Sequence, residues 1–324
     1  MASPPISWPL ISRHWSIRRC RSGVAPTSVI GVGTRRRLDA ELVRRGLAPS
    51  RERAQSEIAA GRVLVGGAPA SKASRMVDAA ESVVVLGPPP RFVSRAGAKL
   101  AGAIEHFDLH DEFRDVLVLD VGASTGGFTD CALQCGAREV IALDVGHNQL
   151  HERIRHDPRV RVLERTNIRS TDPDLIGAPA QIVVADLSFI SLRLVLGPML
   201  GLCVPGALLV LLVKPQFEAG RVEAARGRGI ITDPSIWRRV LEEVTSALVG
   251  TGAAIMGVMV SPITGSDGNV EFILVARSAG PTPQPGLDDA ALSVAIDEAV
   301  AIASHRGARL AASEADARPR PGGV

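Results

Sequence analysis

The chain has 324 residues, of which 46% are hydrophobic and 22% charged, and this composition excludes a protein that is disordered throughout. Its longest strongly apolar run, residues 206–213, is far shorter than the roughly 20 residues that a transmembrane helix needs, so we expect no membrane span. The four cysteines form no CxxC pair and have no zinc-type spacing. They indicate neither a disulfide framework nor a metal site, and they favour a reducing cytoplasm.

Charge is distributed unevenly along the chain. Residues 1–99 contain 17 Lys and Arg against 6 Asp and Glu, a net charge of +11, whereas the remaining residues sum to −8. This asymmetry predicts that the front of the chain meets a polyanion, most simply nucleic acid. A basic tail without a partner is the alternative. Only three of the basic residues are lysines, at positions 72, 99 and 214.

The front of the chain divides into three predicted segments. Residues 1–33 are rich in Pro, Ser and Arg and lack a signal-peptide core, so we expect a disordered extension; an organelle transit peptide would have a similar composition. Residues 34–87 predict a small domain with two short helices, the second capped by Ser50, and a hairpin with a Gly-Gly turn. The proline-rich residues 88–95 follow as a linker.

Residues 96–280 are predicted to form an α/β domain with a Rossmann-like sheet. Continuous apolar runs alternate with longer helical stretches, which is typical of strands buried on both faces of a mostly parallel sheet. The last two runs predict an antiparallel hairpin at the sheet edge. Residues 281–324 would add an amphipathic helix near 287–304 and a flexible tail. The predicted strands are the runs at 116–122, 139–146, 159–166, 181–188, 207–214, 254–262 and 270–277.

A glycine-rich loop follows the first strand of this domain. In DVGASTGGF, which begins at Asp120, Gly122, Gly126 and Gly127 let the backbone approach a ligand closely, and Asp120 can accept hydrogen bonds. The spacing differs from GxGxxG, which disfavours a nicotinamide dinucleotide. Asp144, which ends the next strand, stands where an acid usually holds ribose hydroxyls. The loop and Asp144 together predict an unphosphorylated nucleoside cofactor, S-adenosyl-L-methionine; a plain tight turn is the alternative.

Two of the rare lysines are candidates for chemistry. Lys214 ends an apolar strand and Lys99 lies on a short helix, and a lysine can act as a base where burial or another cation lowers its pKa. Asp186 ends a further strand, and Glu271 enters the last one, where an unpaired carboxylate would be costly to bury. The alternatives are a snorkelling or surface side chain for each lysine, and a turn cap or a solvated acid for the two carboxylates.

The stretch from about residue 35 to 277 resembles the TlyA family, whose members are classed both as hemolysins and as ribosomal RNA cytidine 2′-O-methyltransferases. RLDAELVRRGLAPSRERA followed by GRVLV is similar to the family's RNA-binding module, the small fold first seen in the fourth small-subunit ribosomal protein. DVGASTGGFTD, ADLSFISL, LVKPQFEAG and GNVEFIL are similar to its methyltransferase module. In the wider group of FtsJ-like RNA 2′-O-methyltransferases the catalytic set is Lys-Asp-Lys-Glu, which the resemblance places on Lys99, Asp186, Lys214 and Glu271.

The resemblance implies methylation of the cytidine ribose 2′-hydroxyl in ribosomal RNA of the small subunit, the large subunit or both. Ribosomal RNA or ribosomal subunits would then be the partners, and no metal would be needed. We expect Lys214 to orient and deprotonate the hydroxyl, with Lys99 nearby and with Asp186 and Glu271 holding both ammonium groups. The residues expected to bind the cofactor are Asp120, Gly122, Ser124, Thr125, Gly126, Gly127, Asp144 and Asn167.

Arginines on the small domain are candidates for contacts with RNA phosphates. Because only 3% of the residues are aromatic and Tyr is absent, stacking platforms are disfavoured, and recognition of a folded RNA by shape and backbone is favoured. A solvated arginine face is the alternative. The candidates are Arg36, Arg37, Arg44, Arg45, Arg51 and Arg53.

Two functions of other classes stay open. A membrane-active cytolysin would match the other name of the family, although Pro198 and Pro205 interrupt the apolar segment 187–214. A liposome-leakage assay would reveal it. A non-catalytic RNA-binding protein of ribosome assembly would keep the fold without transferring a methyl group, and a methylation assay would distinguish it.

Overall fold

The computed structural model describes residues 35–48, 50–87, 90–220, 223, 227, 229–284 and 286–316, with side chains up to residue 306. The predicted extension 1–33 and the end of the predicted tail, 317–324, lie outside the described residues. Contacts divide the chain into two compact units. One contains the described residues up to Leu47 and Arg51–Val85, and the other contains Ala48–Ser50 and the described residues from Leu86 onward.

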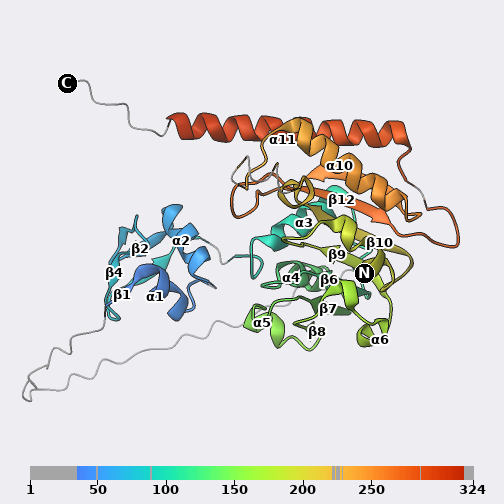
Figure 1. The fold of residues 1–324 in the computed structure, drawn as a ribbon. Helices are drawn as coiled ribbons and strands as arrows, with labels where there is room; N and C mark the ends of the chain where they lie inside the picture. Colours follow the sequence, from blue (N-terminus) through green and yellow to red (C-terminus); the bar gives the residue numbers. More distant parts are fainter. Residues whose placement is uncertain are drawn as a thin grey trace, which may run out of the picture. The chain divides into compact units, whose positions relative to one another are not determined.

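The first unit packs two helices beside short antiparallel strands (Figure 1). Leu38 and Leu42 of α1 (Leu38–Arg44) and Ala54 and Ile58 of α2 (Arg51–Ala59) are buried together. The strands are β1 (Arg36–Arg37) with β4 (Met76–Val77), and β2 (Val63–Val65) between β3 (Ala68–Pro69) and β5 (Val83–Val85). Gly66 and Gly67 form the turn between β2 and β3 with φ of 61° and 83°. The predicted helices and hairpin are confirmed.

The second unit is built on a seven-stranded sheet with the order β11-β12-β10-β9-β6-β7-β8. Among its described strands β12 runs opposite to the others, and it pairs antiparallel with β10 on one side and β11 on the other. The predicted mostly parallel sheet with an antiparallel edge hairpin is therefore confirmed. The strands are β6 (Leu117–Val121), β7 (Glu139–Leu143), β8 (Val160–Leu163), β9 (Ala180–Ala185), β10 (Cys203–Val213), β11 (Ala254–Val260) and β12 (Phe272–Arg277).

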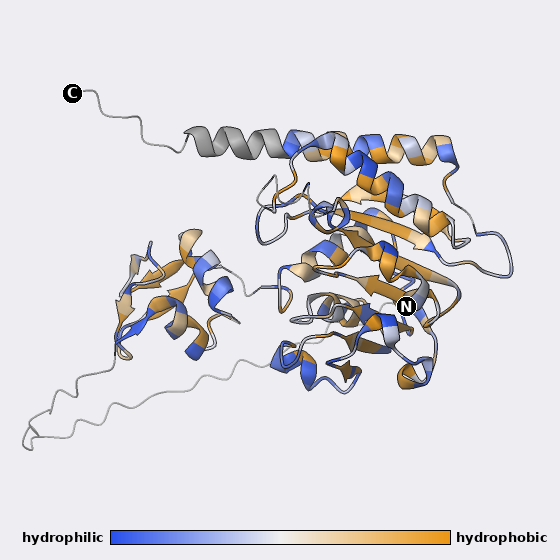
Figure 2. Ribbon diagram, viewed as in Figure 1, coloured by the Kyte–Doolittle hydropathy of each residue, from blue (hydrophilic) through white to orange (hydrophobic). Residues whose placement is uncertain are grey.

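Helices cover both faces of this sheet, and Figure 2 shows its strands as mostly hydrophobic. Leu117 and Leu119 of β6 join the core beneath α10 and α11, whereas Val118 joins the core beneath α3 and α4. Burial on both faces explains why the strands are continuous apolar runs. The helices are α3 (Ala96–His106), α4 (Gly127–Gln134), α5 (Glu152–Arg155), α6 (Pro173–Ile176), α7 (Leu196–Leu200), α8 (Pro215–Glu218), α10 (Pro234–Val249) and α11 (Asp289–Asp316), with 3-10 turns η1 (Ile168–Ser170) and η2 (Leu192–Leu194).

The C-terminal helix is longer than its periodicity predicts. We expected a helix near residues 287–304, and α11 continues to Asp316. Its first part packs on β11 and α10 through Ile296, Ala299 and Ala303. Of the helices in the described part of the chain, none combines the length and the hydropathy that crossing a bilayer requires.

Candidate active site

A tight glycine loop joins β6 to α4. Gly122 and Gly126 have φ of 84° and 89°, values that glycine adopts without strain. A Cβ on Gly122 would lie 2.8 Å from the carbonyl oxygen of Asp186, so the loop can approach the end of β9 only with glycine there. Of the other predicted loop residues, Ser124 and Thr125 are exposed, and Gly127 is buried as the first residue of α4. The helix α4 therefore begins at the last glycine of the loop.

The Asp144 carboxylate lies directly after β7 beside this loop. Its Oδ2 accepts a hydrogen bond from the backbone N–H of Ser124 at 2.8 Å, and its Oδ1 accepts one from Gly146 at 2.6 Å. A pocket opens beside it, with a polar part and an apolar part. Its lining consists of Ala123, Ser124, Ala142, Asp144, Gly146, Gln149, Leu150, Val162 and Glu164.

Asp120 is fully enclosed near the end of β6. Its Oδ2 accepts a hydrogen bond from Thr129 Oγ1 at 2.6 Å, and its Oδ1 has no hydrogen-bond partner among the described residues. Burial raises the pKa of this carboxyl group to about 7, and the negative charges of Asp186 and Asp144 add to that rise. The carboxyl groups of Asp144 and Asp186 therefore lie close enough to Asp120 to disfavour a negative charge on it.

The four residues of the predicted catalytic set converge in one cluster. Lys214 Nζ lies 2.6 Å from Oδ1 of Asp186, whose Oδ2 lies 3.7 Å from Lys99 Nζ. Lys99 Nζ in turn lies 2.6 Å from Oε2 of Glu271. Both lysines and Glu271 are less than 9% exposed. Two cations and two anions thus alternate, so each buried charge has a partner of opposite sign.

The antiparallel strand explains how Glu271 reaches this cluster. Lys214 and Asp186 directly follow the carboxyl ends of the parallel strands β10 and β9. Because β12 runs the other way, its first residue, Phe272, pairs with Val213, the last residue of β10. The residue that enters β12 therefore lies at the same edge of the sheet as residues that leave β9 and β10.

Two residues that the sequence did not single out, Ser188 and Phe189, follow Asp186, and the first of them contacts Lys214. The Lys214 ammonium group donates a hydrogen bond to Ser188 Oγ at 2.9 Å. Phe189, the next residue, is 91% exposed and has a φ of 66°, and its ring lies 5.1 Å from that of Phe217. Ser188 and Phe189 belong to the motif ADLSFISL, which also contains Asp186. The sequence could not single out Phe189, because a positive φ at a bulky residue has no sequence pattern of its own.

Asn167 does not line the pocket at Asp144. It is the N-cap of η1, where its Oδ1 accepts a hydrogen bond from the N–H of Arg169 at 3.0 Å. It lines a second, open pocket together with Arg165, Thr166 and residues 170–172. The structure thus brings Asp144 and the glycine loop together. Asn167 lines a different pocket, but the N–H of the preceding residue, Thr166, donates to the carbonyl of Asp144 at 2.9 Å.

Comparison with known proteins identifies the family. Residues 92–278 match the FtsJ-like methyltransferase family, and residues 36–84 match the S4 domain. The sequence is 46% identical over 245 residues to the 16S/23S rRNA (cytidine-2′-O)-methyltransferase TlyA of Mycobacterium tuberculosis, a match that covers 75% of this chain and 90% of that protein. The chain belongs to the TlyA family of FtsJ-like methyltransferases. The resemblance seen in the motifs is therefore confirmed.

Other members of the TlyA family bear a different name. Hemolysin A of Brachyspira hyodysenteriae is 38% identical over 239 residues, which cover 73% of this chain and 98% of that protein. A solved structure of a hemolysin-named protein from Streptococcus thermophilus superposes with a TM-score of 0.67 at 38% identity, covering 85% of this chain and 98% of that one. The chain is therefore similar in sequence to proteins of both names, and it shares the fold of the hemolysin-named structure.

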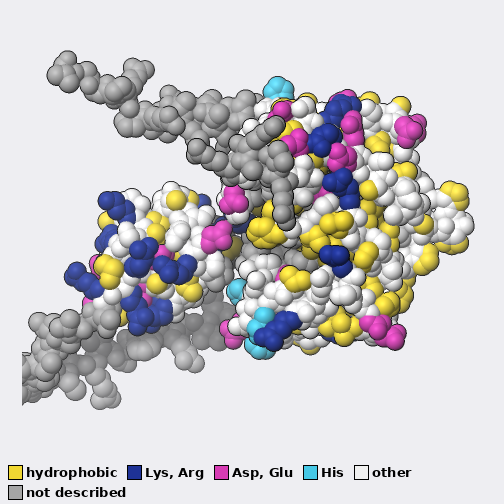
Figure 3. All heavy atoms as spheres, viewed as in Figure 1, with side chains coloured by type: hydrophobic (Ala, Val, Ile, Leu, Met, Phe, Trp, Pro, Cys, Tyr) yellow, Lys and Arg dark blue, Asp and Glu magenta, His cyan; other side chains and the backbone are white. Residues whose placement is uncertain are grey.

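The arginines of the S4 domain differ in what they contact, although Figure 3 shows several of them on the surface of this domain. Arg37 and Arg51 pair with the buried Asp39, at 3.1 and 3.0 Å. Arg45 pairs with Glu41 and also donates to the backbone carbonyls of Asp78, Ala79 and Glu81.

Two further candidates also pair with acids, and the last has no ion-pair partner in the described part of the chain. Arg44 pairs with Glu41 at 2.6 Å, and Arg53 pairs with Glu57 at 2.6 Å. The arginines hold the pKa of Glu41 at about 2, mainly through the hydrogen bonds from Arg44. Arg36 is exposed and has no ion-pair partner among the described residues. Five of the six candidates thus form ion pairs within the domain, and Arg45 also stabilises its backbone through hydrogen bonds.

Proposed function

We propose that this protein methylates the 2′-hydroxyl of a cytidine ribose in ribosomal RNA, with S-adenosyl-L-methionine as the methyl donor. The observation that carries the proposal is the buried cluster of Lys99, Asp186, Lys214 and Glu271 in a chain of the TlyA family. Charged groups gathered at the carboxyl edge of a mostly parallel sheet are typical of catalytic sites.

The pocket at Asp144 suits the adenosine part of the cofactor. The carboxylate keeps lone pairs for ribose hydroxyls, since each oxygen accepts one backbone N–H. Ala142, Leu150 and Val162 offer an apolar wall for the base. The neighbouring carboxyl groups of Asp144 and Asp186 favour a ligand with positive charge. The proposed cofactor-binding set is Asp120, Gly122, Ser124, Thr125, Gly126, Gly127, Asp144 and Asn167.

The cluster would orient the ribose and remove one proton. When bound, the cofactor supplies a methyl group that its sulfonium already activates, so alignment is the main task and can contribute roughly 7–11 kcal/mol. In our proposal Lys214 contacts the hydroxyl oxygen, and the proton passes to the coupled Lys214–Asp186 pair as the oxygen takes the methyl group. Glu271 holds Lys99, and Lys99 holds the second oxygen of Asp186.

The rest of the chain would hold the RNA. The S4 domain supplies exposed arginines such as Arg36 for phosphates. Beside the cluster, the exposed Phe189 ring offers a face on which the target base can stack. Ribosomal RNA or ribosomal subunits would be the partner, and we place the enzyme in the cytoplasm, where that substrate is.

The test is transfer of tritium from labelled S-adenosylmethionine to unmodified ribosomal subunits, with wild type compared with Lys214→Ala. We expect alkali-resistant label with the wild type and none with the variant, because a 2′-O-methyl group protects the adjacent phosphodiester. Cofactor affinity of both proteins, measured by calorimetry, serves as the control for folding and should be equal.

Either of two results would overturn the proposal. Absence of label on every form of the subunits, with cofactor binding intact, would favour a non-catalytic RNA-binding protein. Equal transfer by wild type and Lys214→Ala would show that the cluster has no role in catalysis.

A further inference from the structure

A buried carboxylate close to the cluster takes no part in the steps above. Glu218 is the last residue of α8, which begins directly after Lys214. The residue is only 4% exposed. Burial raises the pKa of its carboxyl group, and hydrogen bonds from Ser191 and Leu192 oppose that rise. A buried acid is retained only where such partners are in place.

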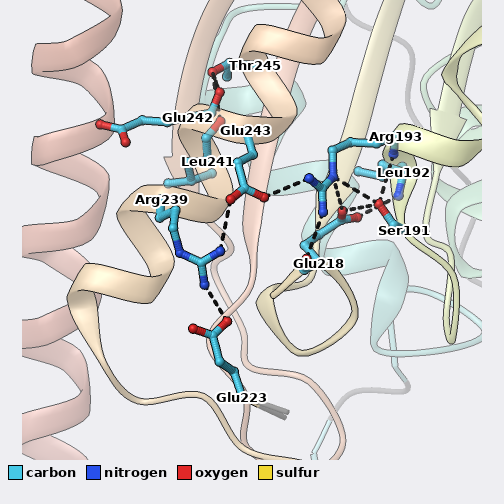
Figure 4. A network of polar contacts seen from close by, with 10 residues as sticks. All are labelled: Ser191, Leu192, Arg193, Glu218, Glu223, Arg239, Leu241, Glu242, Glu243 and Thr245. Carbon is cyan, nitrogen blue, oxygen red and sulfur yellow. Dashed lines mark hydrogen bonds and ion pairs between the residues drawn. The ribbon is translucent and has the colours of Figure 1, made fainter. Parts of the chain in front are cut away.

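The partners of Glu218 lie on the segment that starts at Asp186. One carboxylate oxygen accepts a hydrogen bond from the backbone N–H of Leu192 at 2.6 Å, and the other accepts one from Ser191 Oγ (Figure 4). Ser191 is the N-cap of η2. Glu218 therefore fixes the end of the loop that leads from Asp186 to η2.

This loop is thus fastened twice to one short segment of chain. At its start, Asp186 and Ser188 contact the ammonium group of Lys214. At its end, the contacts go to Glu218, on the helix that follows Lys214. Between the two attachments lies Phe189, whose positive φ costs free energy and persists only where the surroundings impose it.

A series of polar contacts connects Glu218 to the helix α10. Arg193 donates to the backbone carbonyl of Glu218 at 3.0 Å and to Oε2 of Glu243 at 2.8 Å. Glu243 also pairs with Arg239 at 3.0 Å, and both stand on α10 (Figure 4). Because buried residues of α10 pack against the sheet, these contacts connect the loop to a rigid element.

We propose that Glu218 is a positioning residue, which holds the loop with Asp186, Ser188 and Phe189 in register with Lys214. The proposal rests on the proposed function, because it assigns Glu218 a role in the same reaction. The backbone N–H of Glu218 donates to the carbonyl of Lys214 at 3.2 Å, within the turn that starts α8. Among the described residues its carboxylate contacts neither ammonium group, so the carboxylate acts through Asp186 and Ser188.

The test compares Glu218→Ala and Glu218→Gln with Glu242→Gln. Glu242 is the control because it neighbours Glu243 on α10, whereas its carboxylate pairs with Arg238 and has no part in the contacts to Glu218. We expect kcat to fall at least about tenfold in Glu218→Ala, since small misplacements of reacting groups are costly. Glu218→Gln should lie between, because its amide oxygen can still accept from Leu192. Glu242→Gln should equal the wild type.

Two readouts separate positioning from mere support of the fold. The KM and the dissociation constant for S-adenosylmethionine should stay within about twofold, because Asp144 and its pocket do not contact Glu218. The pH profile of kcat should shift, because a displaced Asp186 changes the charge environment of Lys214. Loss of kcat with a parallel loss of cofactor affinity, and an unshifted profile, would overturn the proposal.

A milder variant covers the case in which Glu218→Ala fails to fold. Ser191→Ala removes one hydrogen bond to Glu218, and it should lower kcat a few-fold. The double variant with Glu218→Gln should be no worse than the poorer single variant, because both changes release the same attachment. Fully additive losses would contradict this. If these variants match the wild type while Lys214→Ala is inactive, only the positioning role is wrong; if Lys214→Ala is active, the proposed function itself fails.

Discussion

Lys99 and Glu271 form a buried ion pair with 2.6 Å between Nζ and Oε2, although they stand at opposite ends of the methyltransferase sequence. Lys99 enters from α3, ahead of the first strand of the sheet, and Glu271 enters from the start of β12. The pair leaves Lys99 within 3.7 Å of Asp186 as well. The contacts therefore run in one line from Glu271 through Lys99 and Asp186 to Lys214.

Breaking this pair should cost both stability and activity. In Glu271→Ala the Lys99 ammonium loses its nearest partner, and truncation of one member of a buried pair costs about 3–5 kcal/mol of unfolding free energy. The double variant Lys99→Met with Glu271→Leu should regain most of this stability but remain inactive. Urea unfolding and tritium transfer measure the two effects. A double variant as unstable as Glu271→Ala, or one that still transfers methyl groups, would contradict the prediction.

Asp120 should make stability fall as the pH rises. Its folded pKa of about 7 lies above that of an unfolded carboxyl group, so the folded protein keeps a proton that the unfolded chain has lost. The stabilising contribution is complete below about pH 4 and is lost as the pH rises through 7. The advantage of Asp120→Asn over wild type should grow by about 2–3 kcal/mol between pH 5 and 8.5.

Urea unfolding at the two pH values measures this effect. Asp157→Asn is the matched control, because Arg159 lowers the pKa of that acid instead of raising it. A difference between Asp120→Asn and wild type that stays constant with pH would show that Asp120 is ionised throughout.

Asp144→Asn should weaken the binding of S-adenosylmethionine. The amide keeps one acceptor for the N–H groups of Ser124 and Gly146 but lacks the charge that strengthens bonds to ribose hydroxyls. Loss of about 1.5–3 kcal/mol corresponds to roughly 10- to 100-fold in the dissociation constant. Calorimetric titration measures it, with Asp157→Asn as the control. Unchanged affinity would exclude Asp144 from the cofactor site.

Arg36 and Arg45 should give opposite results in the S4 domain. Arg36→Ala should leave stability unchanged and lower the salt dependence of RNA binding by about one counterion, since the side chain is exposed and unpaired among the described residues. Arg45→Ala removes donors to three backbone carbonyls and should destabilise by about 1–3 kcal/mol. Thermal unfolding and RNA titration at several salt concentrations compare them. A stable Arg45→Ala protein with reduced RNA affinity would reverse these roles.

Phe189→Ala should impair use of RNA and leave cofactor binding intact. Stacking of a base on an aromatic ring contributes about 1–3 kcal/mol, so kcat/KM for RNA should fall roughly 5- to 100-fold. Phe189→Tyr keeps the ring and should retain most of the activity. Steady-state kinetics with ribosomal subunits measure both variants. If Phe189→Ala and wild type use RNA equally, the exposed ring does not contact the substrate.

The strands and the glycine loop of this protein follow from its sequence alone. Strands buried on both faces need continuous apolar residues, and a backbone with positive φ needs glycine, as at Gly122 and Gly126. Both are local requirements, so they leave local patterns. The scarcity of lysine likewise marks Lys99 and Lys214 as candidates, and the positions of Asp186 and Glu271 at strand ends mark the two acids.

The pairing of charges was decided only by the tertiary structure. Glu271 reaches Lys99 because β12 runs antiparallel between β10 and β11. Glu218 accepts a hydrogen bond from Ser191. Arg45, which the sequence offered as a contact for RNA, donates instead to backbone carbonyls of its own domain. Whether a charged side chain faces solvent, RNA or another residue depends on how segments far apart in the chain pack together. A local pattern of residues does not specify that packing.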